Sequence, residues 1–105
     1  MSAIYILDRV KLRAENIQEY QQALRERYLP GARERGMEWV GSWVTPPVEV
    51  KEGNELVTLW SLPGIEAFWA MRAASSAPEV AAWWAESDRL TLSRERKIMS
   101  QVEIS

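Results

Sequence analysis

The sequence predicts an α+β fold of the ferredoxin-like type, β-α-β-β-α(α)-β, with an antiparallel four-stranded sheet and helices on one of its faces. Four stretches alternate at the period of a strand, and the segments between them repeat apolar residues at the period of a helix. The two central strand stretches are apolar on both faces, whereas a sheet with one wet face alternates more strictly. We therefore expect helices of the same chain to cover one face and a second copy to cover the other. Two copies paired in this way form a dimeric α/β barrel.

The first strand is predicted over Ala3–Leu12. One of its faces carries Ile4, Ile6, Asp8, Val10 and Leu12. Asp8 is therefore the one acid among four aliphatic neighbours.

The first helix is predicted to begin at a capping box formed by Asn16 and Glu19. Its inner stripe consists of Ile17, Tyr20, Leu24 and Tyr28. We expect Pro30 to kink or end this helix, because Leu29 is disfavoured in the α region before a proline. Gly36 then fits a left-handed stop.

The centre of the chain predicts two strands, Met37–Thr45 and Glu55–Leu62, joined by a long loop over Pro46–Asn54. Strict alternation places Trp39, Gly41 and Trp43 on the same face of the first strand. On the second strand, one face carries Leu56, Thr58, Trp60 and Leu62.

The last third predicts a helix over Ile65–Ala73, with Phe68, Trp69 and Arg72 on one stripe. A second capping box, Ser76 with Glu79, is expected to start another helix that runs to about Arg94. The final strand is predicted over Lys97–Ile104.

A chain of 105 residues predicts a single domain, residues 1–105. Its net charge of −2 gives no electrostatic reason to expect nucleic acid or an anionic membrane as a partner. No apolar run approaches the ~20 residues of a membrane span. The sequence has no signal-peptide pattern and no cysteine, so we expect a cytoplasmic protein.

The absence of histidine and cysteine excludes a Ser–His triad, thiol catalysis and histidine-ligated metals. No group of carboxylates has the spacing of a cation-binding loop. We therefore expect no metal and no cofactor.

Asp8 has two interpretations. It can pair with an arginine such as Arg72 and serve only the fold, or it can line a pocket and act as a general acid or base. Tyr20 and Tyr28 either belong to the core or donate their hydroxyls to a carbonyl or a developing enolate. Asp8, Tyr20, Tyr28 and Arg72 are the predicted catalytic residues.

The six tryptophans also have two interpretations. They fill the core and a dimer interface, or they form an aromatic wall in a cleft between helices and sheet. Trp60, Trp69 and Trp84 are expected to converge on this cleft. The residues predicted to bind substrate are Trp39, Trp43, Thr58, Trp60, Phe68, Trp69 and Trp84.

The runs YLPGARERGMEWVGSW and ELVTLWSLPGIEAFWAMR, and the late helix that leads into SRERKI, resemble NIPSNAP-type members of the dimeric α/β-barrel superfamily. The residues that carry the resemblance are Leu29, Pro30, Gly36, Gly41, Trp60, Trp83 and Trp84. The resemblance covers nearly the whole chain and implies the same fold. The superfamily includes cofactor-free monooxygenases, lactone isomerases, polyketide cyclases and haem enzymes. The chain departs from the family pattern, which commonly has an arginine in place of Asp8 and a tyrosine in place of Val10.

Two functional hypotheses remain. The first is a small cofactor-independent enzyme of isomerase, cyclase, dehydratase or oxygenase type. It would act by proton transfer on an apolar aromatic, polycyclic or terpenoid-like small molecule. Asp8 would then be the acid or base, with Tyr20, Tyr28 and Arg72 as electrophilic partners. The second is a non-catalytic homodimer that binds an apolar ligand or packs only against itself.

Overall fold

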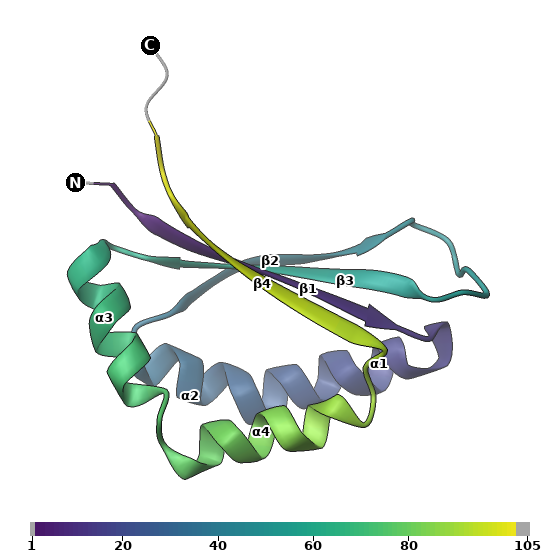
Figure 1. Cartoon of the computed structure of the whole chain (residues 1–105). Helices are drawn as coiled ribbons and strands as arrows, with labels where there is room; N and C mark the ends of the chain where they lie inside the picture. Colours follow the sequence, from purple (N-terminus) through teal and green to yellow (C-terminus); the bar gives the residue numbers. More distant parts are fainter. Residues whose placement is uncertain (1, 103–105) are drawn as a thin grey trace.

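The computed structural model describes residues 2–102 and has one sheet with its helices on a single face (Figure 1). The strands are β1 (Ile4–Leu12), β2 (Glu38–Thr45), β3 (Asn54–Leu62) and β4 (Ser93–Ser100). They lie in the order β2-β3-β1-β4, and every neighbouring pair is antiparallel. The predicted ferredoxin-like fold is confirmed.

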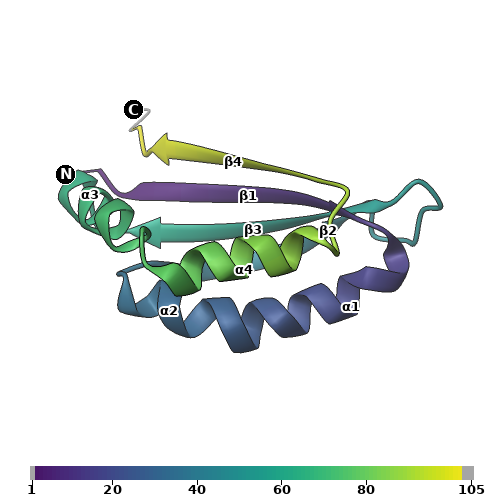
Figure 2. The same ribbon diagram turned by 60° about the horizontal axis from the view of Figure 1, so that its bottom comes forward.

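The helices form two rows beneath the sheet. The segments α1 (Ala14–Ala23), η1 (Leu24–Tyr28, a π-helical turn) and α2 (Leu29–Glu34) make one rod. Figure 2 shows α4 (Pro78–Asp88) alongside this rod, with α3 (Ile65–Ala74) at one end of the sheet. No helix within residues 2–102 has the length and apolarity needed to cross a membrane.

The core lies between the helices and the central strands β1 and β3. Every second residue of β3, from Asn54 to Leu62, is buried against the helices, as the alternation predicts. The helices contribute Tyr20, Tyr28, Phe68 and Trp83 to this core. Asn54 closes the β2–β3 loop: its side-chain amide donates to the Pro46 and Val48 carbonyls at 3.1 and 2.8 Å.

A β-bulge in β2 overturns the predicted facing of Trp39 and Trp43. The pairing with β3 shifts between Trp39 and Gly41, so Val40 is an extra residue. Trp39 pairs with Trp60 on the helix-covered face, whereas Gly41 and Trp43 pair with residues of the opposite face. A Cβ on Gly41 would lie 2.9 Å from the Trp43 ring, so glycine lets this ring lie flat along its own strand.

The first helical rod begins and continues differently from the prediction. It begins at Ala14 after Arg13, and the amide of Asn16 donates to the Arg13 carbonyl, so Asn16 is not the N-cap. Leu29 adopts the α conformation and the rod continues through Pro30. The π-helical turn allows this, because the Leu29 amide donates to Leu24, five residues back. Gly36 does end the rod, with a φ of 93°.

The capping box predicted at Ser76 is also wrong. Ala77 is the N-cap of α4, and the Ser76 hydroxyl donates to the Ala73 carbonyl at 3.0 Å. The helix ends at Asp88 rather than near Arg94, because the Leu92 amide already pairs with the Lys11 carbonyl at 2.8 Å. β4 therefore begins four residues earlier than predicted. The predicted end of this strand, residues 103–104, lies outside the described residues.

The face of the sheet opposite the helices, which we call the open face, is not covered by any helix of the described chain. Its apolar members are Tyr5, Leu7, Trp43, Val57, Leu59 and Met99. Trp43 is 54% exposed. At its centre Arg9 forms a bidentate pair with Glu55 at 2.9 and 3.1 Å.

Candidate functional site

Asp8 lies on the helix-covered face of β1 and is held by three donors. Arg96, its neighbour on β4, donates from Nε to Oδ1 at 2.6 Å and from Nη2 to Oδ2 at 2.9 Å. The Trp60 indole donates to Oδ2 at 3.1 Å. The predicted pairing with Arg72 is wrong, since Arg72 is an exposed residue of α3.

The ion pair is largely shielded, with side-chain exposures of 16% for Asp8 and 29% for Arg96. Burial opposes the positive charge of Arg96, but the hydrogen bond and negative charge of Asp8 outweigh it and raise the pKa of Arg96. Arg96 therefore remains charged at neutral pH and can make the bidentate contact with Asp8.

Tyr28 connects this ion pair to an aromatic cluster. Its hydroxyl accepts a hydrogen bond from Arg96 Nη2 at 3.3 Å. Its ring lies 5.5 Å from Trp60 and Trp83 and 5.7 Å from Trp84. The Arg96 guanidinium in turn lies 5.1 Å from the centre of the Trp84 ring. The structure thus brings together Asp8, Tyr28, Trp60 and Trp84, which the sequence predicted to be functional.

A cleft of about 220 Å³ opens beside this network, and we call it the β4-side cleft. It is lined by Asp8, Val10, Tyr20, Trp84, Arg94, Glu95 and Arg96. Burial raises the pKa of Tyr20 to about 12, so its hydroxyl stays protonated at neutral pH. Arg94 pairs through Nη2 with Asp88 and Ser87 at 2.7 and 2.9 Å.

A second cleft, of about 320 Å³, lies on the other side of Trp60, and we call it the β2-side cleft. Its apolar lining residues are Leu24, Leu29, Trp39 and Trp60, and its polar ones are Gln21, Arg25, Arg33 and Ser42. Trp39 is 49% exposed. Its indole donates to Ser42 Oγ at 3.1 Å, and Ser42 is 3.0 Å from the buried Thr58 hydroxyl. The π-helical turn supplies Leu24 and Arg25 to this cleft, and such turns are frequent at functional sites.

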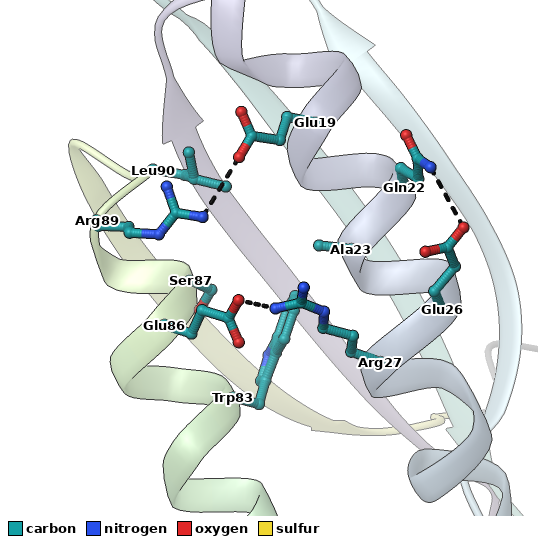
Figure 3. A pocket seen from close by; sticks show the side chains of 10 residues that line it. All are labelled: Glu19, Gln22, Ala23, Glu26, Arg27, Trp83, Glu86, Ser87, Arg89 and Leu90. Carbon is teal, nitrogen blue, oxygen red and sulfur yellow. Dashed lines mark hydrogen bonds and ion pairs between the residues drawn. The ribbon is translucent and has the colours of Figure 1, made fainter.

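A third hollow, the α1–α4 groove of about 160 Å³, is crossed by ion pairs (Figure 3). Arg27 pairs with Glu86, and Arg89 pairs with Glu19 at 3.4 Å. Figure 3 shows both pairs above Trp83 and between the two helices. These contacts join α4 to the first rod and occupy the space that a ligand would need.

Several predicted site residues lie elsewhere. Phe68 is buried in the core, and Trp69, which is 60% exposed, packs edge-on against it from α3. Trp43 lies on the open face, and Arg72 lies on α3 outside both clefts.

Sequence analysis missed Arg96, because a helix end near Arg94 and a strand start at Lys97 left this arginine in the predicted connection between the two elements. The signal that could have found it is the strand alternation of Arg94, Arg96 and Ile98, which face Val10, Asp8 and Ile6 across the sheet. Arg25 and Arg33 were missed because each is followed by a glutamate and another arginine, a pattern that is typical of a solvated helix face.

No family model and no curated protein sequence matches the chain. Solved structures of other proteins do match the chain. A NIPSNAP family protein of unknown function from Agrobacterium tumefaciens is 18% identical with a TM-score of 0.73, over 98% of this chain and 91% of that one. An uncharacterized NIPSNAP domain protein from Burkholderia xenovorans is 12% identical with a TM-score of 0.74, over 97% of both chains. The chain shares its fold with NIPSNAP proteins.

The same fold occurs in SnoaB, a cofactor-independent oxygenase from Streptomyces nogalater. A variant of SnoaB is 14% identical with a TM-score of 0.69, over 99% of this chain and 97% of that one. At these identities the similarity to NIPSNAP proteins and to SnoaB shows the fold alone. Any activity of this chain depends on its own side chains.

Proposed function

We propose that the β2-side cleft binds an apolar, ring-bearing small molecule against the half-exposed ring of Trp39 and over the buried Trp60. One observation carries the proposal: two tryptophans of adjacent strands line the same 320 Å³ cleft, and the π-helical turn and α2 supply its remaining apolar walls. That volume is at the lower end of the range for ligand sites. The cleft therefore suits a compact ring system.

Both rings are held before a ligand arrives. The Trp60 indole is fixed by Asp8, and the Trp39 indole by Ser42. Fixed side chains lose little conformational entropy on binding, so more of the stacking energy appears as affinity. With Trp39 and Thr58 as its neighbours, the Ser42 hydroxyl can orient toward a polar atom of the ligand.

The test is a titration with apolar compounds of one to four fused rings, followed by the indole N–H signals in ¹H–¹⁵N NMR spectra. Trp39→Phe and Trp60→Phe assign the two signals expected to shift. Trp69→Phe assigns a control signal from α3, outside the cleft. The proposal fails if no compound shifts the Trp39 and Trp60 signals more than the Trp69 signal.

A second candidate function is cofactor-independent proton transfer in the β4-side cleft. Asp8 and Tyr20 both line this cleft, and the Tyr20 hydroxyl is a protonated donor at neutral pH. The proton next to a substrate carbonyl would move to Asp8 while Tyr20 donates a hydrogen bond to the enolate oxygen, and Asp8 would then return the proton to carbon. The fold shared with SnoaB supports chemistry without a cofactor.

Deuterium exchange tests this candidate whatever the product of the reaction is. We expect the protein to accelerate incorporation of deuterium next to the carbonyl of 2-tetralone or a larger fused-ring ketone in D₂O. Asp8→Asn should lower this rate at least about hundredfold, a typical contribution of a general base. Glu79→Gln, at an exposed acid of α4, is the matched control. If the protein exchanges no ketone faster than buffer does, the β4-side cleft is structural.

We also propose that a second copy of the chain covers the open face. The charges of this face pair within one chain, Arg9 with Glu55 and Lys97 with Glu95, so the face carries little net charge beside its rings and aliphatic groups. A face whose charges are already paired fits another copy of itself better than a charged partner.

Light scattering coupled to gel filtration tests the dimer. Leu59→Arg places a charge in the middle of the open face and should convert a dimer into a folded monomer. Ala81→Arg, at an exposed position of α4, is the control and should leave the dimer intact. A wild-type mass of one chain would overturn the proposal.

A further inference from the structure

The β2-side cleft has an excess of positive charge that the β4-side cleft and the α1–α4 groove lack. Its lining contains the guanidinium groups of Arg25 and Arg33, and none of its described lining residues is acidic. In the β4-side cleft Arg96 is neutralised by Asp8, and in the α1–α4 groove Arg27 is neutralised by Glu86. The positive rim of the β2-side cleft thus contrasts with the net charge of the whole chain, which is −2.

Most of the arginines that line a cleft or the sheet have a carboxylate partner. The paired ones are Arg9, Arg27, Arg89, Arg94 and Arg96. Arg25 and Arg33 form no ion pair within residues 2–102, and both are exposed. Their donors are therefore available at the rim of the cleft, above its tryptophan walls.

We infer that the ligand of the β2-side cleft is an amphipathic acid, a compact ring system that carries a carboxylate or another singly charged oxyanion. The inference rests on the proposed function of this cleft and names its ligand class. The ligand's rings lie against Trp39 and over the buried Trp60, and its anionic group lies at the rim, against Arg25 and Arg33. Guanidinium groups bind carboxylates through charge-assisted hydrogen bonds, which are stronger than neutral ones.

The elements that form the cleft separate the two parts of such a ligand. Arg25 and Leu24 belong to the π-helical turn, and Arg33 belongs to α2, so the cations come from the helical rod. Trp39 and Trp60 belong to the sheet. A ligand in this cleft would thus meet rings on one side and cations at the mouth, which is the arrangement an amphipathic acid needs.

The experiment compares matched probes that share a ring system and carry either an anionic carboxylate or a neutral hydroxymethyl group. The pairs are benzoic acid with benzyl alcohol, 2-naphthoic acid with 2-naphthalenemethanol, and 9-anthracenecarboxylic acid with 9-anthracenemethanol. Affinity is measured by calorimetry at pH 7 and low salt. We expect the acid of the best-fitting pair to bind at least about tenfold more tightly than its alcohol. Added salt should weaken only the acid.

Variants of the lining arginines show which residues are responsible for the preference for the acid. Arg25→Gln combined with Arg33→Gln should bring the acid down to the affinity of the alcohol and leave the alcohol unchanged. Arg72→Gln, at an exposed arginine of α3, should keep the preference. A preference that survives the double variant would show that other groups recognise the anion and would overturn the inference.

The remaining outcomes separate the two proposals. If acid and alcohol bind with equal affinity and shift the Trp39 and Trp60 signals, the cleft binds rings but does not select acids, and only the ligand class is overturned. If no probe of any pair binds, the cleft is not a ring-binding site and both proposals fall.

Discussion

The two clefts on either side of Trp60 differ in how their charged groups are used. In the β4-side cleft Asp8 accepts three hydrogen bonds, and two arginines are paired with carboxylates. In the β2-side cleft Arg25 and Arg33 have no carboxylate among the lining residues. The first cleft is therefore organised by interactions that stabilise the fold, whereas the second leaves its donors available to a ligand.

Trp60 connects the two clefts. Its ring lines the β2-side cleft and its N–H binds Asp8, which lines the β4-side cleft. The polar network thus positions a wall of the apolar cleft. Asp8 can therefore affect the β2-side cleft by positioning Trp60, without contacting the ligand itself.

The largest expected effect comes from breaking the network with Arg96→Gln. This change leaves the shielded Asp8 carboxylate without its charged partner and should lower the free energy of unfolding by about 2–3 kcal/mol, somewhat less than for a fully buried pair. Urea unfolding measures it. Arg89→Gln, at an exposed ion pair with Glu19, is the matched control and should cost under about 1 kcal/mol.

The double variant Asp8→Asn with Arg96→Gln sharpens this result. It should be more stable than Arg96→Gln alone, because no unpaired charge remains in the interior. Equal losses for Arg96→Gln and Arg89→Gln would mean that the network is no more important than a surface ion pair.

Ionisation of Tyr20 at alkaline pH is expected to lower the free energy of unfolding by roughly 2 kcal/mol. Burial raises the pKa of Tyr20 from 10.0 to about 12, so the folded state binds the phenolic proton more tightly than the unfolded state does. This stabilisation is fully present below pH 10 and is lost as the pH rises toward 12. The free energy of unfolding of wild type should therefore fall through this window.

Tyr20→Phe should lack that part of the alkaline loss of stability, as measured by urea unfolding between pH 9 and 12. Tyr5→Phe, on the open face, is the matched control. The same alkaline slope in wild type and Tyr20→Phe would show that Tyr20 ionises as easily in the folded state as in the unfolded state.

How far the sequence predicts this molecule depends on the regularity of each element. β1 and β3 pair in one register without a bulge, so the fold and the position of Asp8 among aliphatic residues could be predicted. The facing of Trp39 and Trp43 was predicted wrongly, because one extra residue at Val40 reverses the alternation. Gly41 inside the strand is compatible with a bulge, but a glycine alone does not say which residue is extra.

The partner of Asp8 could not be predicted either. Arg96 lies 88 residues away in a charged run that is equally compatible with a helix end and an edge strand. Its role appears only when the register of β4 against β1 is known. Long-range partners of this kind depend on pairing between strands, which composition and spacing within one segment do not specify.

An effect of about 1.5 kcal/mol, or roughly tenfold in affinity, is expected for ring ligands in Trp39→Ala. The half-exposed ring lines the β2-side cleft, so its loss should weaken binding and change the free energy of unfolding by less than about 1 kcal/mol. Trp43→Ala is the matched control, because Trp43 is similarly exposed on the opposite face of β2, and it should leave ligand affinity unchanged. Equal losses of affinity in both variants would contradict the assignment of the cleft to the helix-covered face.

The smallest effect is expected in the α1–α4 groove. Arg27→Ala and Arg89→Ala each remove an ion pair whose partners are about half exposed, so each should cost under about 1 kcal/mol, and the cost should vanish at high salt. Neither change should alter ligand affinity in the β2-side cleft. A large, salt-independent loss would instead show that these pairs hold α4 against the first helical rod, and thereby hold Trp84 beside Asp8 and Arg96. The groove would then act with the β4-side network as one structural unit, and the β2-side cleft would differ from both in not depending on ion pairs among its lining residues.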